Sequence, residues 1–399
     1  MIQHQSVTQL PNAVFEKLGW EYFISEEAKD YLTHQLVVIS QTEGDAYYET
    51  ANRLYERFVE AGEYVLRHNL LDTLGIPRNL HEMIRTTWED DRQMHLYGRF
   101  DFAGGTSGLP IKLLEFNADT PTALPETAMI QWGQLQANGI SDEHQFNFVY
   151  EALTDNFRRL RTLNPDREPV MLFSTMEGAP EDDNNVALLR EAAREAGFET
   201  AFRYIHEVVF SPTEGIFAPL ANGQHRSFPF WFKLVPWEYI ALEEPDLCEI
   251  LTRIVRRDAA LIVNPPYTML FQSKGILKYL WDLFPDDPAL LEASFEEPIG
   301  RTNYPFVQKV FLGREGSNVS IHDDIGLPTE VRKGEYEAQP SIFQALAQLD
   351  QDAEGQYYQA GVFFAYEACG MGFRRSPRRI IDNGAQFAGH TVLPESPKL

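Results

Sequence analysis

Apolar residues recur along the chain with two different periods, and each period predicts one type of secondary structure. Helical spacing runs from Asp45 to Leu71 and, over a shorter stretch, from Asn79 to Trp88, so residues 1–90 are predicted to form a helical N-terminal region. Apolar and polar residues alternate in Leu96–Phe102 and Ile111–Phe116 instead. These two runs flank a loop with three glycines and a proline, which predicts a β-hairpin.

The middle of the chain predicts two further helices and then a βαβ unit. The helices cover Pro125–Asn138 and Glu143–Leu160. In the βαβ unit, a buried strand at Val170–Phe173 is followed by a helix from about Asn185 to Ala196 and a second strand at Glu199–Ile205. Such a unit predicts a parallel sheet covered by helices.

The last third of the chain predicts strands with one helix near its start. An apolar strand after Ala259 leads into a helix that begins near Phe271. Strands are predicted within Tyr304–Ile321 and Ser341–Leu349, and Tyr357–Phe373 predicts two more. Because no repeat, low-complexity tract or linker composition interrupts the chain, the 399 residues predict one closely packed, multi-lobed unit of α+β or α/β class.

The predicted hairpin carries four polar residues that share one face. Side chains alternate across a strand, so Arg99 and Asp101 point the same way, as do Glu115 and Asn117. A register that opposes odd with odd positions brings the four together. Two carboxylates and an amide oxygen are hard ligands that suit Mg²⁺ held jointly with nucleotide phosphates, and Arg99 would face an anion. The alternative is a solvated strand face on which Arg99 is a surface partner.

The motif RFDF, the loop and the motif LLEFNADTPT together resemble the signature of the synthetase domain of glutathionylspermidine synthase and its stand-alone relatives. That family consists of ATP-grasp ligases. The resemblance covers the chain from about Trp20 to Leu393 and implies an ATP-grasp-type fold. In this fold residues 91–260 form a pre-ATP-grasp substrate and metal lobe that contains the βαβ unit, and residues 261–399 form the nucleotide-binding lobes.

The resemblance also implies roles for the hairpin residues. Asp101, Glu115 and Asn117 match the family's ligands for two Mg²⁺ ions that accompany ATP, and Arg99 matches the arginine that contacts the reacting phosphoryl group. Thr120 and Thr122 stand where the family places two hydroxyl residues that contact glutathione. We expect both positions to be serines in the family.

Later segments resemble the family's nucleotide-binding segments. The implied ATP contacts are Lys274, Lys309, Gly313, Gly316, Ser317 and Gln344. A lysine on a strand suits phosphates as a point charge, and a glycine-bearing turn after it would present backbone N–H groups to them. The same spacing occurs in many hairpins. Arg374 matches an arginine that helps bind the transferring phosphate, whereas Arg375, Arg378 and Arg379 are expected on a solvated sheet edge.

Two features concern the acid and amine substrates. Residues 174–184 form an acidic loop after a predicted strand, where open parallel sheets bind ligands. The resemblance implies that Glu181 or Asp182 contacts the peptide or its amine partner; a solvated, helix-capping turn is the equal alternative. Leu234 stands where the family has a hydroxyl residue that touches glutathione, so the resemblance departs at this contact.

Composition narrows the range of partners. Lys and Arg number 34 against 59 Asp and Glu, which gives a net charge of −25. Such a charge disfavours nucleic acid and anionic membranes, and it favours a cationic partner such as a polyamine, although general solubility is the better explanation of the charge. Two cysteines, no leader pattern and no long apolar run predict a cytoplasmic protein. Neither cysteine lies near the N-terminus, so we expect no amidase domain of the kind found in bifunctional family members.

These features predict an ATP- and Mg²⁺-dependent carboxylate–amine ligase. Its substrates would be ATP, an acid such as glutathione or a related peptide, and a polyamine or other amine, joined as an amide through an acyl phosphate. An ATP-dependent ligase for another acid and amine, or a nucleotide-binding protein without turnover, are the alternatives. The sequence indicates no particular oligomeric state.

Overall fold

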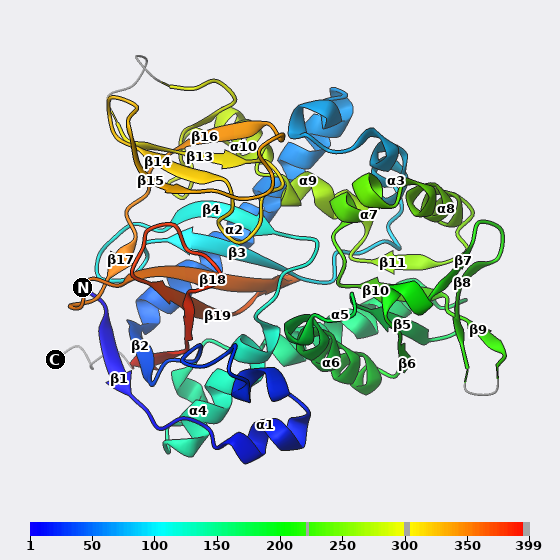
Figure 1. Ribbon diagram of the computed structural model, residues 1–399, viewed down its shortest axis with the longest axis horizontal. Helices are drawn as coiled ribbons and strands as arrows, with labels where there is room; N and C mark the ends of the chain where they lie inside the picture. The colour runs from blue at the N-terminus through cyan, green and yellow to red at the C-terminus, as the bar shows by residue number, and fades with distance from the viewer. Residues whose placement is uncertain (221–222, 299–303, 394–399) are drawn as a thin grey trace.

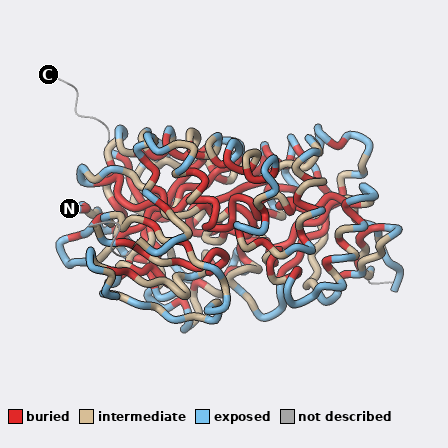
Figure 2. The backbone as a smooth tube through the Cα atoms, turned by 90° about the horizontal axis from the view of Figure 1, so that it is seen from above, coloured by how far each residue is buried: buried red, intermediate tan, exposed pale blue. Residues whose placement is uncertain are grey.

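The computed structural model describes residues 1–220, 223–298 and 304–393. The fold is of mixed α and β class, as predicted, with several sheets and helices packed between and around them (Figure 1). Figure 2 shows the buried backbone running along the interior, with exposed segments at the outer loops. No helix in the described ranges is both long and apolar enough to cross a lipid bilayer.

The central sheet contains the predicted hairpin. Its strand order is β20-β19-β18-β3-β4, with β17 paired to β18. The bounds are β3 (Gly98–Ala103), β4 (Lys112–Asn117), β17 (Asp350–Gln351), β18 (Tyr357–Ala365), β19 (Glu367–Ser376) and β20 (Gln386–Ala388). The hairpin therefore shares one sheet with strands that lie some 250 positions later in the chain.

Helix α2 (Gln41–Arg67) covers the face of the hairpin that points away from the polar residues. Phe58 of α2 packs edge-on against Phe116, which stacks on Phe100 at 3.9 Å between ring centroids. The helix begins four residues before the predicted start because Ser40 and Glu43 form a capping box, each side chain accepting from the other's backbone N–H.

A second, antiparallel sheet faces β3 and β4 (Figure 1). Its order is β12-β16-β13-β14-β15. The bounds are β12 (Ala293–Ser294), β13 (Phe306–Val310), β14 (Val319–His322), β15 (Pro328–Arg332) and β16 (Ser341–Ala345). Lys309 lies on β13 and Gln344 on β16, so the predicted strands at both positions are confirmed.

The predicted βαβ unit is confirmed in a parallel sheet of order β11-β10-β5-β6. The strands are β5 (Val170–Ser174), β6 (Glu199–Phe202), β10 (Phe230–Lys233) and β11 (Leu261–Val263). Helix α6 (Pro180–Glu195) begins five residues before the predicted start. Proline at the first helical turn and acidic residues just after it suit a helix N-terminus, so Glu181 and Asp182 lie in this helix and not in the predicted loop.

Strands from both ends of the chain form a three-stranded sheet. It has the order β1-β2-β21, with β1 (Gln3–Ser6), β2 (Gln35–Ser40) and β21 (His390–Leu393). Residues 1–90 thus include two strands beside the predicted helices. A further hairpin sheet, β7-β8-β9, is built from β7 (Val209–Ser211), β8 (Gly215–Pro219) and β9 (His225–Ser227).

The remaining helices are α1 (Asn12–Leu18), α3 (His81–Trp88), α4 (Gln131–Ala137), α5 (Val149–Leu163), α7 (Trp237–Glu243), α8 (Pro245–Arg256), α9 (Met269–Gln272) and α10 (Ile276–Leu283). Some of them differ from the predicted helices at their ends, and three of them, α1, α7 and α8, were not predicted. A π-helical turn, Glu126–Ile130, precedes α4. The helix predicted to start at Phe271 is wrong as one element, because extended backbone at Ser273 separates α9 from α10. Helix α5 starts late because Phe148 donates its N–H to Cys369 of β19.

Candidate active site between two sheets

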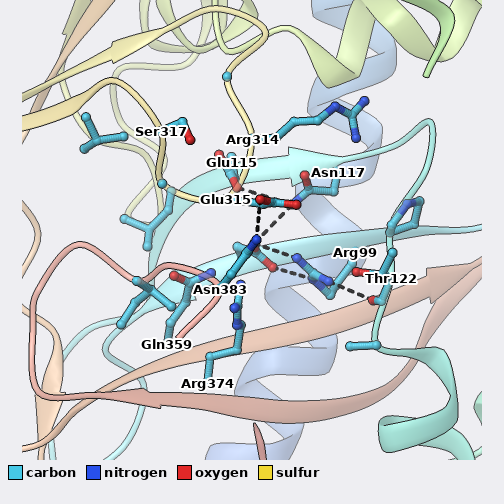
Figure 3. Close-up of a pocket in the computed structure, with 18 of the residues that line it drawn as sticks. Arg99, Glu115, Asn117, Thr122, Arg314, Glu315, Ser317, Gln359, Arg374 and Asn383 are labelled. Atoms are coloured by element: carbon cyan, nitrogen blue, oxygen red, sulfur yellow. Dashed lines mark hydrogen bonds and ion pairs between the residues drawn. The ribbon is translucent and has the colours of Figure 1, made fainter. Parts of the chain in front are cut away.

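A cavity of about 630 Å³ lies between the central sheet and the antiparallel sheet above it. All fifteen residues singled out from the sequence line this cavity. They are Arg99, Asp101, Glu115, Asn117, Thr120, Thr122, Glu181, Asp182, Lys274, Lys309, Gly313, Gly316, Ser317, Gln344 and Arg374. Figure 3 shows how several of them converge from different strands and loops.

The hairpin presents its polar face to the cavity, and the predicted register is confirmed. Arg99 pairs with Asn117 and Asp101 with Glu115, so odd positions oppose odd positions. The phenylalanines at the even positions in between, 100 and 116, are buried against α2. Burial of one face of the hairpin therefore fixes which side chains reach the cavity.

Arg99 and Asp101 form a bidentate ion pair at the base of the cavity. Arg99 Nε lies 2.7 Å from Asp101 Oδ1, and Nη2 lies 3.1 Å from Oδ2. The third guanidinium nitrogen donates to the carbonyl of Thr122 at 2.8 Å. Asn117 donates to Asp101 at 3.0 Å and to Glu115 at 3.3 Å. The four predicted residues thus form one hydrogen-bonded group.

Glu115 faces two lysines from separate elements. Lys274 Nζ, from the segment between α9 and α10, lies 2.9 Å from Glu115 Oε2 and also donates to the Gly313 carbonyl at 2.7 Å. Lys309 Nζ donates to Gln344 Oε1 at 2.8 Å. Burial would raise the pKa of Glu115, but the charges of Lys274 and Lys309 outweigh it and lower that pKa to about 2. Burial lowers the pKa of Lys309 to about 8, although Glu115 acts in the opposite direction.

The donor set at the hairpin fits Mg²⁺. Asp101 and Glu115 are adjacent carboxylates, and Asn117 adds an amide beside them. Within the described ranges, no group of three or more His, Cys, Asp or Glu side chains is placed to hold a metal ion. An ion at the hairpin would therefore need further oxygen ligands from a bound phosphate, which is the usual manner of Mg²⁺ binding at nucleotide sites.

The turn after β13 closes the cavity on the side of the antiparallel sheet. Ser317 donates its N–H to the Arg314 carbonyl at 2.8 Å, and Gly316 adopts a φ of 69°. A Cβ at Gly316 would lie 2.6 Å from the carbonyl oxygen of Ile381, so glycine is needed for this close approach.

Arg314 is a site residue that the sequence reasoning passed over. Its guanidinium donates to buried Glu238 at 2.7 and 3.0 Å and to Thr120 Oγ1 at 2.9 Å. These contacts join the turn after β13 to α7 and to the segment after the hairpin. An arginine inside a glycine-bearing turn was the available signal, but its partner on α7 lies 76 residues away.

Other polar cavity residues were also missed, and three of them lie near the turn after β13 or on the central sheet. Gln359 comes from β18, Glu315 from the turn after β13, and Asn383 from the loop before β20. Asn383 donates to Glu315 across the cavity (Figure 3). Asn383 carried no motif in the sequence, because only the folded loop brings it to the turn.

The acidic end of the cavity is formed by acidic and aromatic residues from α6 and from the N-terminal segment. Glu181 and Asp182 line it together with Tyr22, Glu27 and Tyr31. Burial raises the pKa of Glu181, and burial together with the charges of Glu181 and Asp183 raises the pKa of Asp182 to about 7.

The basic run at the end of β19 contains residues that line the cavity and residues that do not. Because β18 and β20 flank β19, the expected place of Arg375 on a solvated sheet edge is wrong. Arg374 lines the cavity and donates to the Asp382 carbonyl at 2.7 Å. Arg375 pairs with Asp352, and Arg378 pairs with Asp382, away from the cavity lining. Arg379 also lines the cavity, pairs with Glu330 and stays partly exposed beyond the end of β19.

Comparison with known proteins identifies the class to which this fold and cavity belong. A family model described as glutathionylspermidine synthase preATP-grasp matches residues 3–393, so the chain belongs to the glutathionylspermidine synthase family. This family includes acid–amine ligases.

Individual relatives cover the chain to different extents. A Haemophilus influenzae protein, named only as a proposed acid–amine ligase, is 26% identical over an alignment of 388 positions that covers 94% of this chain and 95% of that protein. The bifunctional glutathionylspermidine synthetase/amidase of Escherichia coli is 25% identical over an alignment of 380 positions that covers 89% of this chain and 57% of that protein. The chain thus spans just over half of the bifunctional relative.

A solved structure shares the fold at low sequence identity. The glutathione synthetase-like effector of Globodera pallida, in its apo form, superposes with a TM-score of 0.57 at 10% identity. The match covers 97% of this chain and 98% of the effector chain. At this identity the likeness concerns the fold alone.

Proposed function

We propose that the protein is an ATP- and Mg²⁺-dependent carboxylate–amine ligase with an ATP-grasp-type fold. One observation carries the proposal: the fifteen residues that the family resemblance assigns to metal, ATP and substrate line a single cavity. They come from segments as distant as Arg99 and Arg374, which only the fold brings together. The nucleotide would lie between the two facing sheets.

The charges of the cavity suit phosphoryl transfer, which needs positioning and charge neutralisation more than a protein nucleophile. Lys274 and Lys309 would bind the nucleotide phosphates, and Arg99 and Arg374 would orient the transferring group. The hairpin carboxylates and amide would hold Mg²⁺, which, when bound, neutralises phosphate charge. The turn over residues 313–317 would cover the phosphates with backbone N–H groups.

The reaction has two steps in this proposal. An oxygen of the acid substrate attacks the γ-phosphorus of ATP, the bond to ADP breaks, and an acyl phosphate forms. The amine nitrogen then attacks the acyl carbon, and inorganic phosphate leaves with the bonding electron pair. An amide is the product. Cavity walls that exclude water would protect the acyl phosphate from hydrolysis.

The acid and amine follow from the family and from the charge of the cavity. Glutathione or a related peptide is the proposed acid, with Thr120 and Thr122 as contacts, and a polyamine or other amine would approach from the acidic end near Glu181 and Asp182. One observation favours a second candidate, a ligase for a different acid. Leu234 lies in the cavity wall, and its hydrocarbon side chain has no hydroxyl group to contact a peptide substrate.

The test measures ADP release with Mg²⁺ across a panel of acids and amines. We expect ADP release to require both Mg²⁺ and an acid. We expect Asp101→Asn and Glu115→Gln to lower the rate of ADP release by roughly 1,000-fold, because each removes a charged ligand of the Mg²⁺ that accompanies the phosphates. Asp155→Asn, at a surface ion pair on α5, is the matched control.

Circular dichroism of each variant separates loss of activity from loss of fold. ADP release that persists unchanged in both hairpin variants would exclude these residues as ligands. If the wild-type protein releases no ADP with any acid, the ligase proposal fails.

A further inference from the structure

A tyrosine–glutamate pair at the acidic end of the cavity has no place in the mechanism above. Tyr31 lines the cavity, and its hydroxyl donates to Glu126 Oε1 at 2.7 Å. Glu126 belongs to the π-helical turn before α4 and has no exposed surface. Its second oxygen, Oε2, is buried without a hydrogen-bond partner among the described residues. A buried carboxyl group with one unsatisfied oxygen is costly and calls for a functional explanation.

The pair lies beside the groups proposed to handle the phosphoryl transfer. The charge of Arg99 acts on Glu126, and the charge of Arg374 acts on Tyr31. From α6, Glu181 acts on both members of the pair. Tyr22, which also lines the cavity, is the other titratable neighbour. The Tyr31 hydroxyl therefore lies within range of the charge of Arg374, which is proposed to bind the phosphoryl group, and of Glu181 at the acidic end.

We propose that Tyr31 and Glu126 form a proton relay for the attacking amine. This inference rests on the proposed ligase function. A polyamine nitrogen is an ammonium group at neutral pH and must lose a proton before it attacks the acyl carbon. Tyr31 Oη accepts this first proton and passes its own to the Glu126 carboxylate. As the nitrogen bonds to the acyl carbon, the departing phosphate keeps the bonding electron pair and takes up the second proton. Tyr31 touches the substrate, whereas Glu126 acts through Tyr31 and positions its hydroxyl.

The electrostatics of the pair agree with this role. Burial, followed by the charge of Glu181, raises the pKa of Glu126 to about 7. A general base is most effective when its pKa lies near the working pH. Burial, with the charges of Glu126 and Glu181, raises the pKa of Tyr31 well above its ordinary value. Tyr31 therefore stays protonated between transfers and conducts the proton without keeping a negative charge.

The experiment compares two nucleophiles in the same enzyme. Spermidine is protonated at neutral pH and needs the relay, whereas hydroxylamine is uncharged there and traps the acyl phosphate as a hydroxamate. With the acid that best supports ADP release, Glu126→Gln and Tyr31→Phe should lower kcat for amide formation by roughly 100-fold. Hydroxamate formation should fall far less, so the ratio of the two rates changes.

The pH profile supplies a readout that a purely structural role would not move. In the wild-type protein, amide formation should decline below about pH 7 as Glu126 becomes protonated. This step should be absent from the profile of Glu126→Gln. Tyr150→Phe and Glu195→Gln are matched controls, because Tyr150 also donates to a glutamate, at 3.1 Å, but on the surface of α5 and α6.

Each outcome either supports or overturns the proposed proton relay. Equal losses with both nucleophiles, or no loss in either variant, would overturn it. A pH profile that is the same in Glu126→Gln as in the wild type would do so as well. If wild-type protein forms neither ADP nor hydroxamate with any acid, the ligase function itself has failed, and the relay fails with it.

Discussion

The two ends of the cavity carry carboxylates in opposite environments. At the hairpin, Asp101 is paired with Arg99 and Glu115 with Lys274, at 2.7 and 2.9 Å. At the other end, Glu126 and Asp182 have carboxylates as their strongest charged neighbours, and burial raises both pKa values to about 7. Glu115 is thus an anion at the first end, although burial still raises the pKa of its neighbour Asp101, and Glu126 and Asp182 can accept protons at the second end.

The difference follows from the neighbours of each group and not from burial alone. Burial raises the pKa of any carboxyl group, and nearby cations reverse that effect. Glu115 keeps its charge because two lysines approach it from different elements. Metal binding needs ionised oxygen ligands, whereas proton transfer needs a group that titrates near neutral pH. The cavity therefore separates the chemistry proposed for ATP from the chemistry proposed for the amine.

The largest change in the difference between the two ends is expected when a cation is removed from the hairpin end. Lys274→Met should lower ADP release by roughly 100-fold, because the phosphates lose a positive charge. It should also lower the free energy of unfolding by about 3 kcal/mol, since Glu115 is left without its nearest partner. Turnover assays and urea unfolding measure the two effects.

Lys278→Met is the control for that substitution. Lys278 lies one turn further along on α10 and pairs with Asp282 at the surface, so both quantities should stay within a small factor of the wild type. Activity retained in Lys274→Met would mean that the hairpin end does not depend on this charge.

A pH titration tests the second lysine at the same end. Lys309 has a pKa lowered to about 8, mainly by burial, so it loses its charge as pH rises through that value. We expect kcat/KM for ATP to fall above about pH 8, because this quantity reports groups of the free enzyme. Lys309→Met should be roughly 10-fold less active at pH 7 and lack this decline. Lys112→Met should keep the wild-type profile, because Lys112 lies on β4 but donates to the Pro288 carbonyl outside the cavity lining.

At the acidic end, the effect of pH should appear in the stability of the fold. We expect a rise in pH to remove the contribution of Glu126 to the free energy of unfolding. Between about pH 4.5 and 7 the folded protein keeps a proton on Glu126 that the unfolded chain releases, so this group's contribution to stability is lost as pH rises through 7. Glu126→Gln lacks this loss. Its free energy of unfolding, relative to the wild type, should therefore increase on the order of 2 kcal/mol from pH 5 to pH 8. Glu195→Gln should show no such trend, and a flat difference for Glu126→Gln would contradict the raised pKa.

The sequence predicted the hairpin end well because local rules determine it. Alternation with a buried face fixes the register that brings Asp101 opposite Glu115, and the same rule places Lys309 on a strand. Helix ends were less predictable, since caps such as Ser40 and breaks such as Ser273 depend on single residues.

The acidic end could be predicted only in part. Glu181 and Asp182 were found through the family resemblance, but Tyr31 and Glu126 carry no motif. They meet across 95 positions because the N-terminal segment folds against the turn before α4. Arg314 and Glu238 likewise meet only through tertiary packing. Pairs formed between distant segments have no local pattern, so periodicity and spacing cannot reveal them.

The smallest expected effect concerns the turn that covers the hairpin end. Gly316→Ala places a Cβ 2.6 Å from the Ile381 carbonyl at a φ of 69°, so the turn must shift away from the phosphates. We expect KM for ATP to rise about fivefold with little change in kcat, because remote positioning is weakened more than chemistry. Gly355→Ala has a similar φ of 79° but open space around it, and it isolates the backbone strain. Equal effects from the two substitutions would show that strain alone, and not the fit of the turn against Ile381, governs nucleotide binding at this end.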